Sequence, residues 1–287
     1  MSAPDAAGVV VVAYANASTI DQCLDRLLAA KDVARIVVID NASPDDTGAR
    51  VSRYAAQDRR LSLVRNDRNT GFAAACNQGA TAIAQPWIAF VNPDLYVEPD
   101  TFSRLLAHAR TRAGAGLIGV GLVDERGVPD PASRREAPSL REFLRSALRG
   151  GGNLALGRDP ALSLQPVDAI SGALMLMPSG LFARLGGFDE GYRLHAEDLD
   201  LCRRVRDAGY EVLVANDIET VHVRGVSSRA RPIWSEWQKH RGIWRYLRQH
   251  DVDCRRPGWA VVAVVAISLR FLLAAPMAWW RARRIQR

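Results

Sequence analysis

Gly8-Val9-Val10-Val11-Val12-Ala13-Tyr14 is a short, continuous apolar run that is rich in β-branched side chains. Such a run is typical of a strand that is buried on both faces of a parallel sheet. Directly after it, apolar residues recur at helical spacing, at Ile20, Leu24, Leu27 and Leu28. The chain is therefore predicted to open with a buried strand followed by a helix.

The same alternation of strand and helix continues to residue 91. Apolar runs predict strands at 35–40, 61–65 and 87–91, and a helix is predicted between about 46 and 58. Alternation of this kind implies one α/β sheet with right-handed crossovers, and ligands of such sheets bind beyond the carboxyl ends of the strands. We therefore expect the functional site at that edge of the sheet.

Polar side chains follow three of these strands: Tyr14 after the first, Asp40 after the second, and Asn92 and Asp94 after the fourth. Each alone has an ordinary explanation, because Asp and Asn are common turn formers. Together they could accept hydrogen bonds from a nucleobase or a ribose hydroxyl, and Asp94 could hold a divalent cation beside a diphosphate. The sequence has no Walker-type loop and no Gly-x-Gly-x-x-Gly after the first strand, so a metal is the expected partner for phosphate charge.

A cluster of acidic residues opens a later amphipathic helix. The run Glu197-Asp198-Leu199-Asp200-Leu201-Cys202-Arg203 places three carboxylates at the start of that helix. The positive end of a helix favours anions, so one of them could stay ionised and act as a general base at neutral pH. The alternative is that these carboxylates only cap the helix and compensate its dipole.

Short motifs follow one another along the chain: residues 12–14 (VAY), 38–43 (VIDNAS), 66–77 (NDRNTGFAAACN), 90–94 (FVNPD), 171–173 (SGA), 187–190 (GFDE), 197–201 (EDLDL) and 222–225 (HVRG). In this order they resemble the family 2 glycosyltransferases, and within them the rhamnosyltransferase-like branch, from about Val9 to His250. The resemblance implies a GT-A fold, which is a Rossmann-like mixed α/β sheet flanked by helices.

The resemblance also implies roles for individual residues. The nucleotide would be bordered by Ala13, Tyr14, Asp40, Asn69, Gly71, Phe72, Asn92 and Asp94. The sugars would lie beside Gly172, Ala173 and Glu197, the metal would be held by Asp94 and His222, and Asp198 matches the catalytic base. Two positions depart from the family pattern: Asn92 replaces the first acid of the Asp-x-Asp metal motif, and Ala13-Tyr14-Ala15-Asn16 replaces the usual Thr-Tyr-Asn.

The activity that the resemblance implies is an inverting transfer of a sugar from a nucleoside diphosphate to a lipid-linked or polysaccharide acceptor, with Mg²⁺ or Mn²⁺ as the metal. Rhamnose from dTDP-rhamnose is the expected donor group, a UDP-sugar is the alternative, and the product would belong to the cell envelope. A non-catalytic scaffold that binds sugar nucleotides is a hypothesis of a different class. It is disfavoured because the base and metal positions are both occupied by suitable residues.

The segment from Leu117 to Val167 breaks the alternating pattern with Gly, Pro and Arg-rich sequence, and one short helix is predicted over 139–148. The family resemblance places acceptor-side loops here, and the alternative is a solvated excursion. Arg134 and Arg135 could meet an anionic acceptor, a role that the sequence alone assigns to neither of them.

The C-terminal region, 224–287, is basic and aromatic, and it follows a predicted catalytic domain over residues 1–223. Its basic residues up to position 256 are Arg224, Arg229, Arg231, Lys239, Arg241, Arg245, Arg248, Arg255 and Arg256, interleaved with Trp234, Trp237, Trp244 and Tyr246. Basic residues among aromatics suit either nucleic acid or the interface of an anionic membrane.

An almost entirely apolar segment, 259–280, favours the membrane over nucleic acid. It is long enough to cross a bilayer, but Arg270 near its middle would cost about 2.5–3.5 kcal/mol there. Arg270, Pro276 and the flanking tryptophans favour a helix, or a bent pair of helices, in the headgroup region; spanning and a buried core helix are the alternatives. We expect a cytoplasmic protein, peripheral on the inner face of the membrane, whose oligomeric state the sequence leaves open.

Overall fold

The computed structural model describes residues 6–148, 154–223 and 232–285. Its sheet contains the strands β1 (Ala7–Ala13), β2 (Val33–Asp40), β3 (Leu61–Arg65), β4 (Trp87–Val91), β5 (Leu95–Tyr96), β6 (Ala115–Val123), β7 (Leu164–Pro166), β8 (Leu174–Pro178) and β9 (Glu211–His222). The α-helices are α1 (Ile20–Ala29), α2 (Thr47–Gln57), α3 (Phe72–Ala80), α4 (Thr101–Thr111), α5 (Leu140–Leu148), α6 (Ser179–Arg184), α7 (Glu197–Asp207), α8 (Pro232–His250) and α9 (Pro257–Ile285). Short 3-10 turns occur at η1 (Pro131–Ser133) and η2 (Asp253–Arg255).

The strands follow the order β3-β2-β1-β4-β8-β6-β9-β5, and β7 pairs with β9. β1 is parallel to both β2 and β4, whereas β8 runs antiparallel to β4 and to β6. The strands predicted at 61–65 and 87–91 are confirmed with the same bounds, and the strand predicted at 35–40 lies within β2. The predicted α/β class is therefore confirmed, as a mixed sheet.

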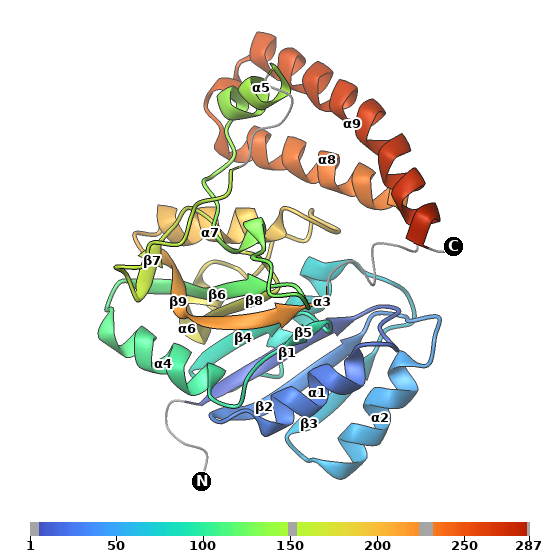
Figure 1. Cartoon of the computed structure of the whole chain (residues 1–287), viewed down its shortest axis with the longest axis vertical. Coiled ribbons are helices and arrows are strands. Elements are labelled where there is room, and N and C mark those ends of the chain that lie inside the picture. The colour runs from blue at the N-terminus through green and yellow to red at the C-terminus, as the bar shows by residue number, and fades with distance from the viewer. Residues whose placement is uncertain (1–5, 149–153, 224–231, 286–287) are drawn as a thin grey trace.

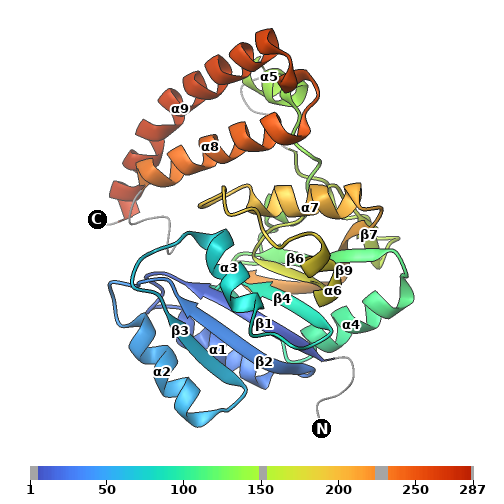
Figure 2. The same ribbon diagram turned by 180° about the vertical axis from the view of Figure 1, so that it is seen from behind.

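Helices cover both faces of the sheet, with α1, α2 and α4 on one face and α3, α6 and α7 on the other (Figures 1 and 2). Along β1, Val9 and Val11 pack into the first of these two layers, and Val10 and Val12 pack into the second. Successive side chains of a strand point to opposite faces, so a strand covered on both sides must be apolar throughout. This accounts for the unbroken apolar run in the sequence.

The break predicted at Leu117 is wrong, because this residue lies inside the buried strand β6. The glycines of β6 permit close packing. A Cβ atom at Gly116 would lie 2.5 Å from the Cβ of Tyr210, and one at Gly119 would lie 2.9 Å from the Cδ1 of Ile170. Composition alone suggested a loop, whereas these glycines let neighbouring elements approach the sheet, and the irregular segment begins only where β6 ends.

The helices α8 and α9 lie next to each other on the side of α7 that faces away from the sheet, and α5 packs against α9 (Figure 1). α8 is anchored to the rest of the protein where Nε2 of His250 lies 2.8 Å from Oδ1 of Asp200. α9 continues through Pro276 as one helix, not as a bent pair. Only 11% of its most apolar 18-residue window is buried, so the core-helix alternative is wrong. By length and composition alone, Pro257–Trp280 could cross a membrane.

Candidate active site

The carboxyl ends of β1 and β2 hold three of the residues predicted to border the nucleoside: Ala13, Tyr14 and Asp40. The backbone N–H of Asn41 donates to the carbonyl oxygen of Ala13 at 2.9 Å and keeps the two strand ends together. Asp40 is buried; its Oδ1 accepts from the N–H of Ser43 at 2.9 Å, and its Oδ2 lies 3.4 Å from Nε of Arg65. The carboxylate thus stabilises the turn after β2, and a contact to the nucleoside would be an additional role.

Asn41, to which the sequence assigned no role of its own, holds the loop that carries Asn69, Gly71 and Phe72. Its Oδ1 accepts from the N–H of Thr70 at 3.0 Å, and its Nδ2 lies 3.2 Å from both Oδ1 of Asn69 and the carbonyl oxygen of Gly71. Gly71 has φ +95°, and a Cβ atom there would lie 3.0 Å from the carbonyl oxygen of Arg193. A side chain other than glycine would therefore push this loop away from the segment before α7.

Asp94 and His222 come together because β5 and β9 pair antiparallel beside them, with Leu95 opposite His222. Nε2 of His222 lies 3.3 Å from Oδ1 of Asp94, and Nδ1 lies 3.8 Å from Oδ2 of Asp130. Asp130 is buried and was not singled out from the sequence, which carries no signal that it would reach His222. At 3.8 Å this contact is too long for a hydrogen bond, so Asp130 places a carboxylate behind the imidazole without fixing its tautomer.

These side chains fit a divalent cation whose coordination a diphosphate completes. Nδ1 of His222 is buried with no hydrogen-bond partner among the described residues, which leaves the tautomer free to adapt to a ligand on Nε2. In the part of the chain that the structure describes, no group of three His, Cys, Asp or Glu side chains could hold a metal ion by itself. Mg²⁺ is usually bound by one or two carboxylates together with substrate phosphates, so a metal here would depend on the nucleotide.

Asp198, Gly172 and Ala173 meet where the start of α7 approaches β8. Oδ2 of Asp198 accepts from Nη2 of Arg135 at 2.5 Å and from the N–H of Gly172 at 3.3 Å. The carbonyl oxygen of Ala173 in turn accepts from the N–H of Asn92 at 2.9 Å. A continuous set of contacts therefore runs from the predicted base to the carboxyl end of β4.

The three carboxylates of α7 have different surroundings. Asp200 is buried between Arg204, at 2.7 Å, and His250, at 2.8 Å, so it ties α7 to α8. Burial, and then the charge of Asp198, raise the pKa of Glu197 to about 8, so this side chain is mostly neutral at pH 7. Asp198 differs from both, because its carboxylate pairs with Arg135 of the segment that follows β6.

The turn that precedes α7 has two non-glycine residues in the left-handed conformation, His195 with φ +66° and Ala196 with φ +70°. Ala196 occupies the cap position and makes no side-chain cap bond, but Oδ1 of Asp198 accepts from the N–H of Leu199 at 2.8 Å within the first turn, so capping stays an alternative role for the acidic cluster. Successive residues of this conformation are strained, and strain of this kind is concentrated at functional sites. The carboxylates still lie in the first turn, where the helix dipole favours anions.

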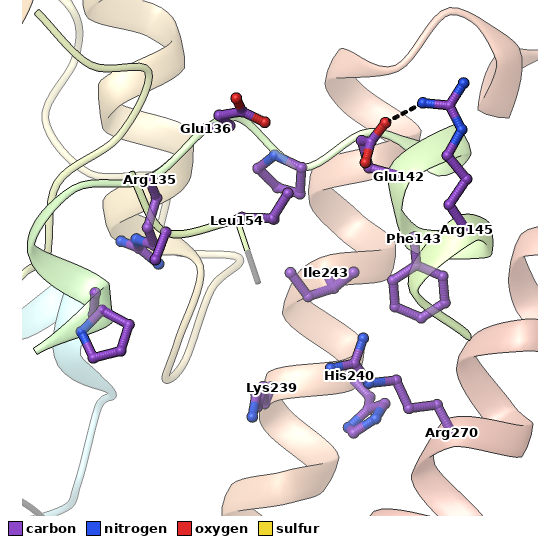
Figure 3. Close-up of a pocket in the computed structure, with 14 residues that line it drawn as sticks. Arg135, Glu136, Glu142, Phe143, Arg145, Leu154, Lys239, His240, Ile243 and Arg270 are labelled. Carbon is purple, nitrogen blue, oxygen red and sulfur yellow. Dashed lines mark hydrogen bonds and ion pairs between the residues drawn. The ribbon is translucent and has the colours of Figure 1, made fainter. Parts of the chain in front are cut away.

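A cavity of about 440 Å³ lies between the segment that follows β6 and the helices α8 and α9 (Figure 3). Its walls include Arg135, Phe143, Lys239, Ile243 and Arg270. Because Arg135 also contacts Asp198, the cavity borders the predicted base.

The two adjacent arginines of the segment that follows β6 make different contacts. Arg134 is buried, and its Nη2 and Nε donate to Oδ1 of Asn216 at 2.7 and 2.9 Å. Arg135 instead reaches both the cavity and Asp198. Neighbouring residues in extended backbone point to opposite sides, and no local pattern indicates which of the two arginines faces the site.

Part of the predicted basic region lies outside the described residues: Arg224, Gly225, Arg229 and Arg231. Within α8, Arg245 pairs with Asp189 at 2.8 Å, and Nη1 of Arg248 donates to the carbonyl oxygen of Cys254 at 2.7 Å. These two arginines therefore attach α8 to its neighbours in the chain.

Comparisons with known proteins agree with this geometry. Residues 8–157 match the model of glycosyl transferase family 2. The N-acetylglucosaminyl-diphospho-decaprenol L-rhamnosyltransferase of Mycobacterium tuberculosis is 26% identical over 311 aligned positions, which cover 98% of this chain and 97% of the relative. Rhamnosyltransferase WbbL of Escherichia coli is 25% identical over 216 positions, 75% of this chain and 82% of WbbL.

Solved structures show the same architecture. The mannosyltransferase PcManGT from Pyrobaculum calidifontis, in complex with GDP-Man and Mn²⁺, superposes with a TM-score of 0.61 at 21% identity over 96% of this chain and 75% of that one. GalNAc-T7 with UDP, GalNAc and Mn²⁺ has a TM-score of 0.62 at 16% identity over 76% of this chain, which spans only 44% of GalNAc-T7. The chain belongs to glycosyl transferase family 2 and is a glycosyltransferase with the GT-A fold.

Proposed function

We propose that the protein transfers a sugar from a nucleoside diphosphate to a hydroxyl group of a lipid-linked or polysaccharide acceptor, with inversion and with a divalent metal. The observation that carries this proposal is the set of contacts that joins Asp198, through Gly172 and Ala173, to Asn92 at the end of β4. A base and a leaving-group region lie on the same side of the sheet in this arrangement. Single displacement requires both of them around one anomeric carbon.

Asp198 would remove the proton of the acceptor hydroxyl as its oxygen attacks the anomeric carbon from the face opposite the diphosphate. One displacement inverts the configuration at that carbon. Glu197 supports this role by being neutral, because two adjacent ionised carboxylates would repel each other in a buried place. Arg135 and the N–H of Gly172 hold Oδ2 of Asp198 and so orient the base toward the acceptor.

Asp94 and His222 would hold Mg²⁺ or Mn²⁺, and a bound cation would neutralise the charge that develops on the departing diphosphate. Asn92 would offer a neutral oxygen in place of the usual first acid. Asp130 would keep the imidazole of His222 in position from behind. The two solved structures of similar fold are described with Mn²⁺, which supports a divalent ion in general.

The names of the relatives guide the choice of sugar and acceptor. Two of them are rhamnosyltransferases, and one acts on an N-acetylglucosaminyl-diphospho-decaprenol. We therefore favour rhamnose from dTDP-rhamnose and an acceptor that carries a lipid diphosphate, for cell-envelope glycan synthesis. A UDP-sugar is the second candidate, because GalNAc-T7 and TarS of S. aureus are described with UDP.

We further propose that residues 1–223 form the catalytic domain and that 224–287 associate with the membrane, peripherally and on its cytoplasmic face. The exposed apolar surface of α9 supports this division. A contiguous exposed apolar surface on a protein marks an interaction with another protein or with lipid.

The proposed function is tested by a transfer assay with the full-length protein in detergent micelles. A panel of dTDP-rhamnose, UDP-sugars and GDP-mannose is offered with a lipid-linked acceptor, with Mn²⁺, Mg²⁺ or excess chelator. We expect transfer from dTDP-rhamnose only when metal is present, and a product whose anomeric configuration, read by NMR, is inverted. Retained configuration would overturn the single displacement, full activity in chelator would overturn the metal, and preference for a UDP-sugar would change the donor alone.

A further inference from the structure

The cavity beside Arg135 has a surplus of positive charge. Its lining contains the basic side chains of Arg135, Arg145, Lys239 and Arg270, against the carboxylates of Glu136 and Glu142. Glu142 already pairs with Arg145 at 2.5 Å. Arg135 and Lys239 pair with carboxylates outside the lining, Asp198 at 2.5 Å and Glu236 at 3.7 Å, while the lining itself presents four basic side chains and two acidic ones, which favours an anionic occupant.

Arg270 is the charged residue within the apolar part of α9, and its position on the helix accounts for its presence there. It shares a helix face with the buried residues Ala263 and Ile267, which precede it by seven and three positions. Its guanidinium lies 5.2 Å from the ring centre of Phe143 on α5, and in Figure 3 the side chain extends from α9 toward His240 on α8. Arg270 thus lines the cavity on the α5 and α8 side of α9, where it remains exposed, and does not lie on the outer face of α9.

The opposite face of α9 is apolar and exposed. It presents Val261, Val265, Leu269 and Leu272, each more than half exposed. Charged side chains are costly in hydrocarbon, whereas these residues gain from entering it, so lipid is the partner that suits a face with this composition. With that face in the membrane, the cavity on the inner side of α9 would lie at the level of the lipid headgroups.

Arg135 connects this cavity with the chemistry. Its Nη2 donates to Oδ2 of Asp198, whereas its Nε is buried and makes no hydrogen bond to any of the described residues. A buried guanidinium N–H without an acceptor is costly, and an oxygen of a ligand in the cavity would satisfy it. An anion bound here would sit next to the residue that orients the base.

We propose that this cavity binds the diphosphate of a membrane-embedded, lipid-linked acceptor, with Arg270 and Lys239 at the outer side and Arg135 at the side of Asp198. This inference rests on the proposed function and assigns to it an acceptor site of named residues. The lipid chain would leave the cavity along α9, and the sugar attached to the diphosphate would point toward Asp198. The cavity would then select acceptors by their charged link and not by their sugar alone.

The test measures binding and does not require turnover. Full-length protein is titrated with phosphatidylcholine vesicles that contain a polyprenyl diphosphate, and with vesicles of matched surface potential that contain phosphatidylglycerol. We expect wild-type protein to bind the diphosphate vesicles roughly tenfold more tightly, a preference of about 1.4 kcal/mol. The double variant Lys239→Gln/Arg270→Gln should lose this preference and retain its binding to phosphatidylglycerol.

Arg241→Gln is the matched control, because Arg241 is exposed on α8 and does not line the cavity. It removes a basic charge from α8, the helix that carries Lys239, and should leave the preference intact. Equal binding of wild type to both kinds of vesicle would overturn the inference, and so would equal loss of preference in the control and the double variant. Binding of dTDP-rhamnose, followed by thermal stabilisation, should be unchanged in all variants; failure of sugar transfer with a preserved vesicle preference would instead overturn the proposed function.

Discussion

The sheet around β1 and the outer helix α9 differ in how far the rest of the chain covers their apolar side chains. β1 is buried along its whole length, and the polar group beside it that orders the site, Asn41, finds its partners within the chain. α9 leaves most of its apolar window exposed, and large side chains such as Leu272 and Leu273 have no cover. The first region is complete as a folded chain, whereas the second needs a partner that the chain does not supply.

The proposed site, which lies between the sheet and α9, contains buried polar atoms without partners in the described part of the chain. Buried polar atoms that lack a hydrogen-bond partner within the described ranges include Nδ1 of His222, Oε2 of Glu197 and Nε of Arg135. Native proteins rarely leave such atoms unsatisfied without a reason. These three belong to the proposed site, where donor, metal or acceptor would supply partners, and six similar atoms lie on other described residues: Asp21, Gln85, Arg204, Arg206, Thr220 and Glu236. The predictions below separate this site from the sheet that supports it and from the helix that covers it.

The largest effect is expected from Asp198→Asn. The amide keeps the size of the side chain but cannot take a proton, so kcat should fall by about 10²–10⁴-fold while donor affinity stays nearly unchanged. Steady-state kinetics and donor titration measure the two quantities. Asp207→Asn is the control, because Asp207 ends the same helix in an exposed pair with Arg203 at 2.8 Å. Near-normal turnover of the Asp198 variant would move the base elsewhere.

A loss of about 10²-fold in the affinity for a metal–nucleotide complex is expected from Asp94→Ala, because the cation would join this carboxylate to the diphosphate. Asp130→Asn should cost less, about tenfold, since it acts only through the orientation of His222. Mn²⁺ binding in the presence of the nucleoside diphosphate, measured by electron paramagnetic resonance, gives both values. Wild-type binding by the Asp94 variant would show that the metal, if one is used, is held by other groups.

Two charges on the outer face of α9 should reduce membrane binding by at least about tenfold and leave donor binding unchanged. The variant is Val265→Glu/Leu272→Glu, measured by flotation with anionic liposomes. Its control, Val128→Glu/Leu162→Glu, places the same charges at comparably exposed apolar positions outside α9. Equal flotation of the two variants would remove α9 as the membrane anchor.

The smallest effect concerns Glu197 and pH. Its pKa is raised in the folded protein to about 8, so the folded state holds this proton more tightly than the unfolded chain does. The stability that the neutral side chain confers is therefore complete below about pH 4.5 and is lost as the pH rises toward 8. Glu197→Gln should escape this loss in thermal denaturation between pH 5 and 9. If the unfolding temperatures of the variant and the wild type depended on pH in the same way, the raised pKa of Glu197 would be contradicted.

Much of the N-terminal part of the sheet could be predicted from local pattern. The strands β3 and β4 follow directly from apolar runs with polar ends, because burial on both faces of a sheet leaves a continuous signal in the sequence. β6 was missed for the opposite reason: its glycines are selected by close neighbours such as Tyr210 and Ile170, which lie far along the chain. Asp130 was missed because only the pairing of β6 with β9 brings His222 beside the turn that follows β6.

The local sequence was thus enough to indicate an α/β sheet, polar residues at its edge, an acidic helix start and an apolar C-terminal helix. Each of these is a pattern of residues that are close together in the chain. Tertiary structure was needed to separate the three carboxylates of α7. Asp200 is neutralised by Arg204 and His250, Glu197 is kept uncharged by burial, and Asp198 faces Arg135. The same holds for Arg270, whose direction follows from the packing of α9 on α5 and α8. The charge and contacts of a side chain depend on neighbours that long-range packing supplies, and no local pattern contains them.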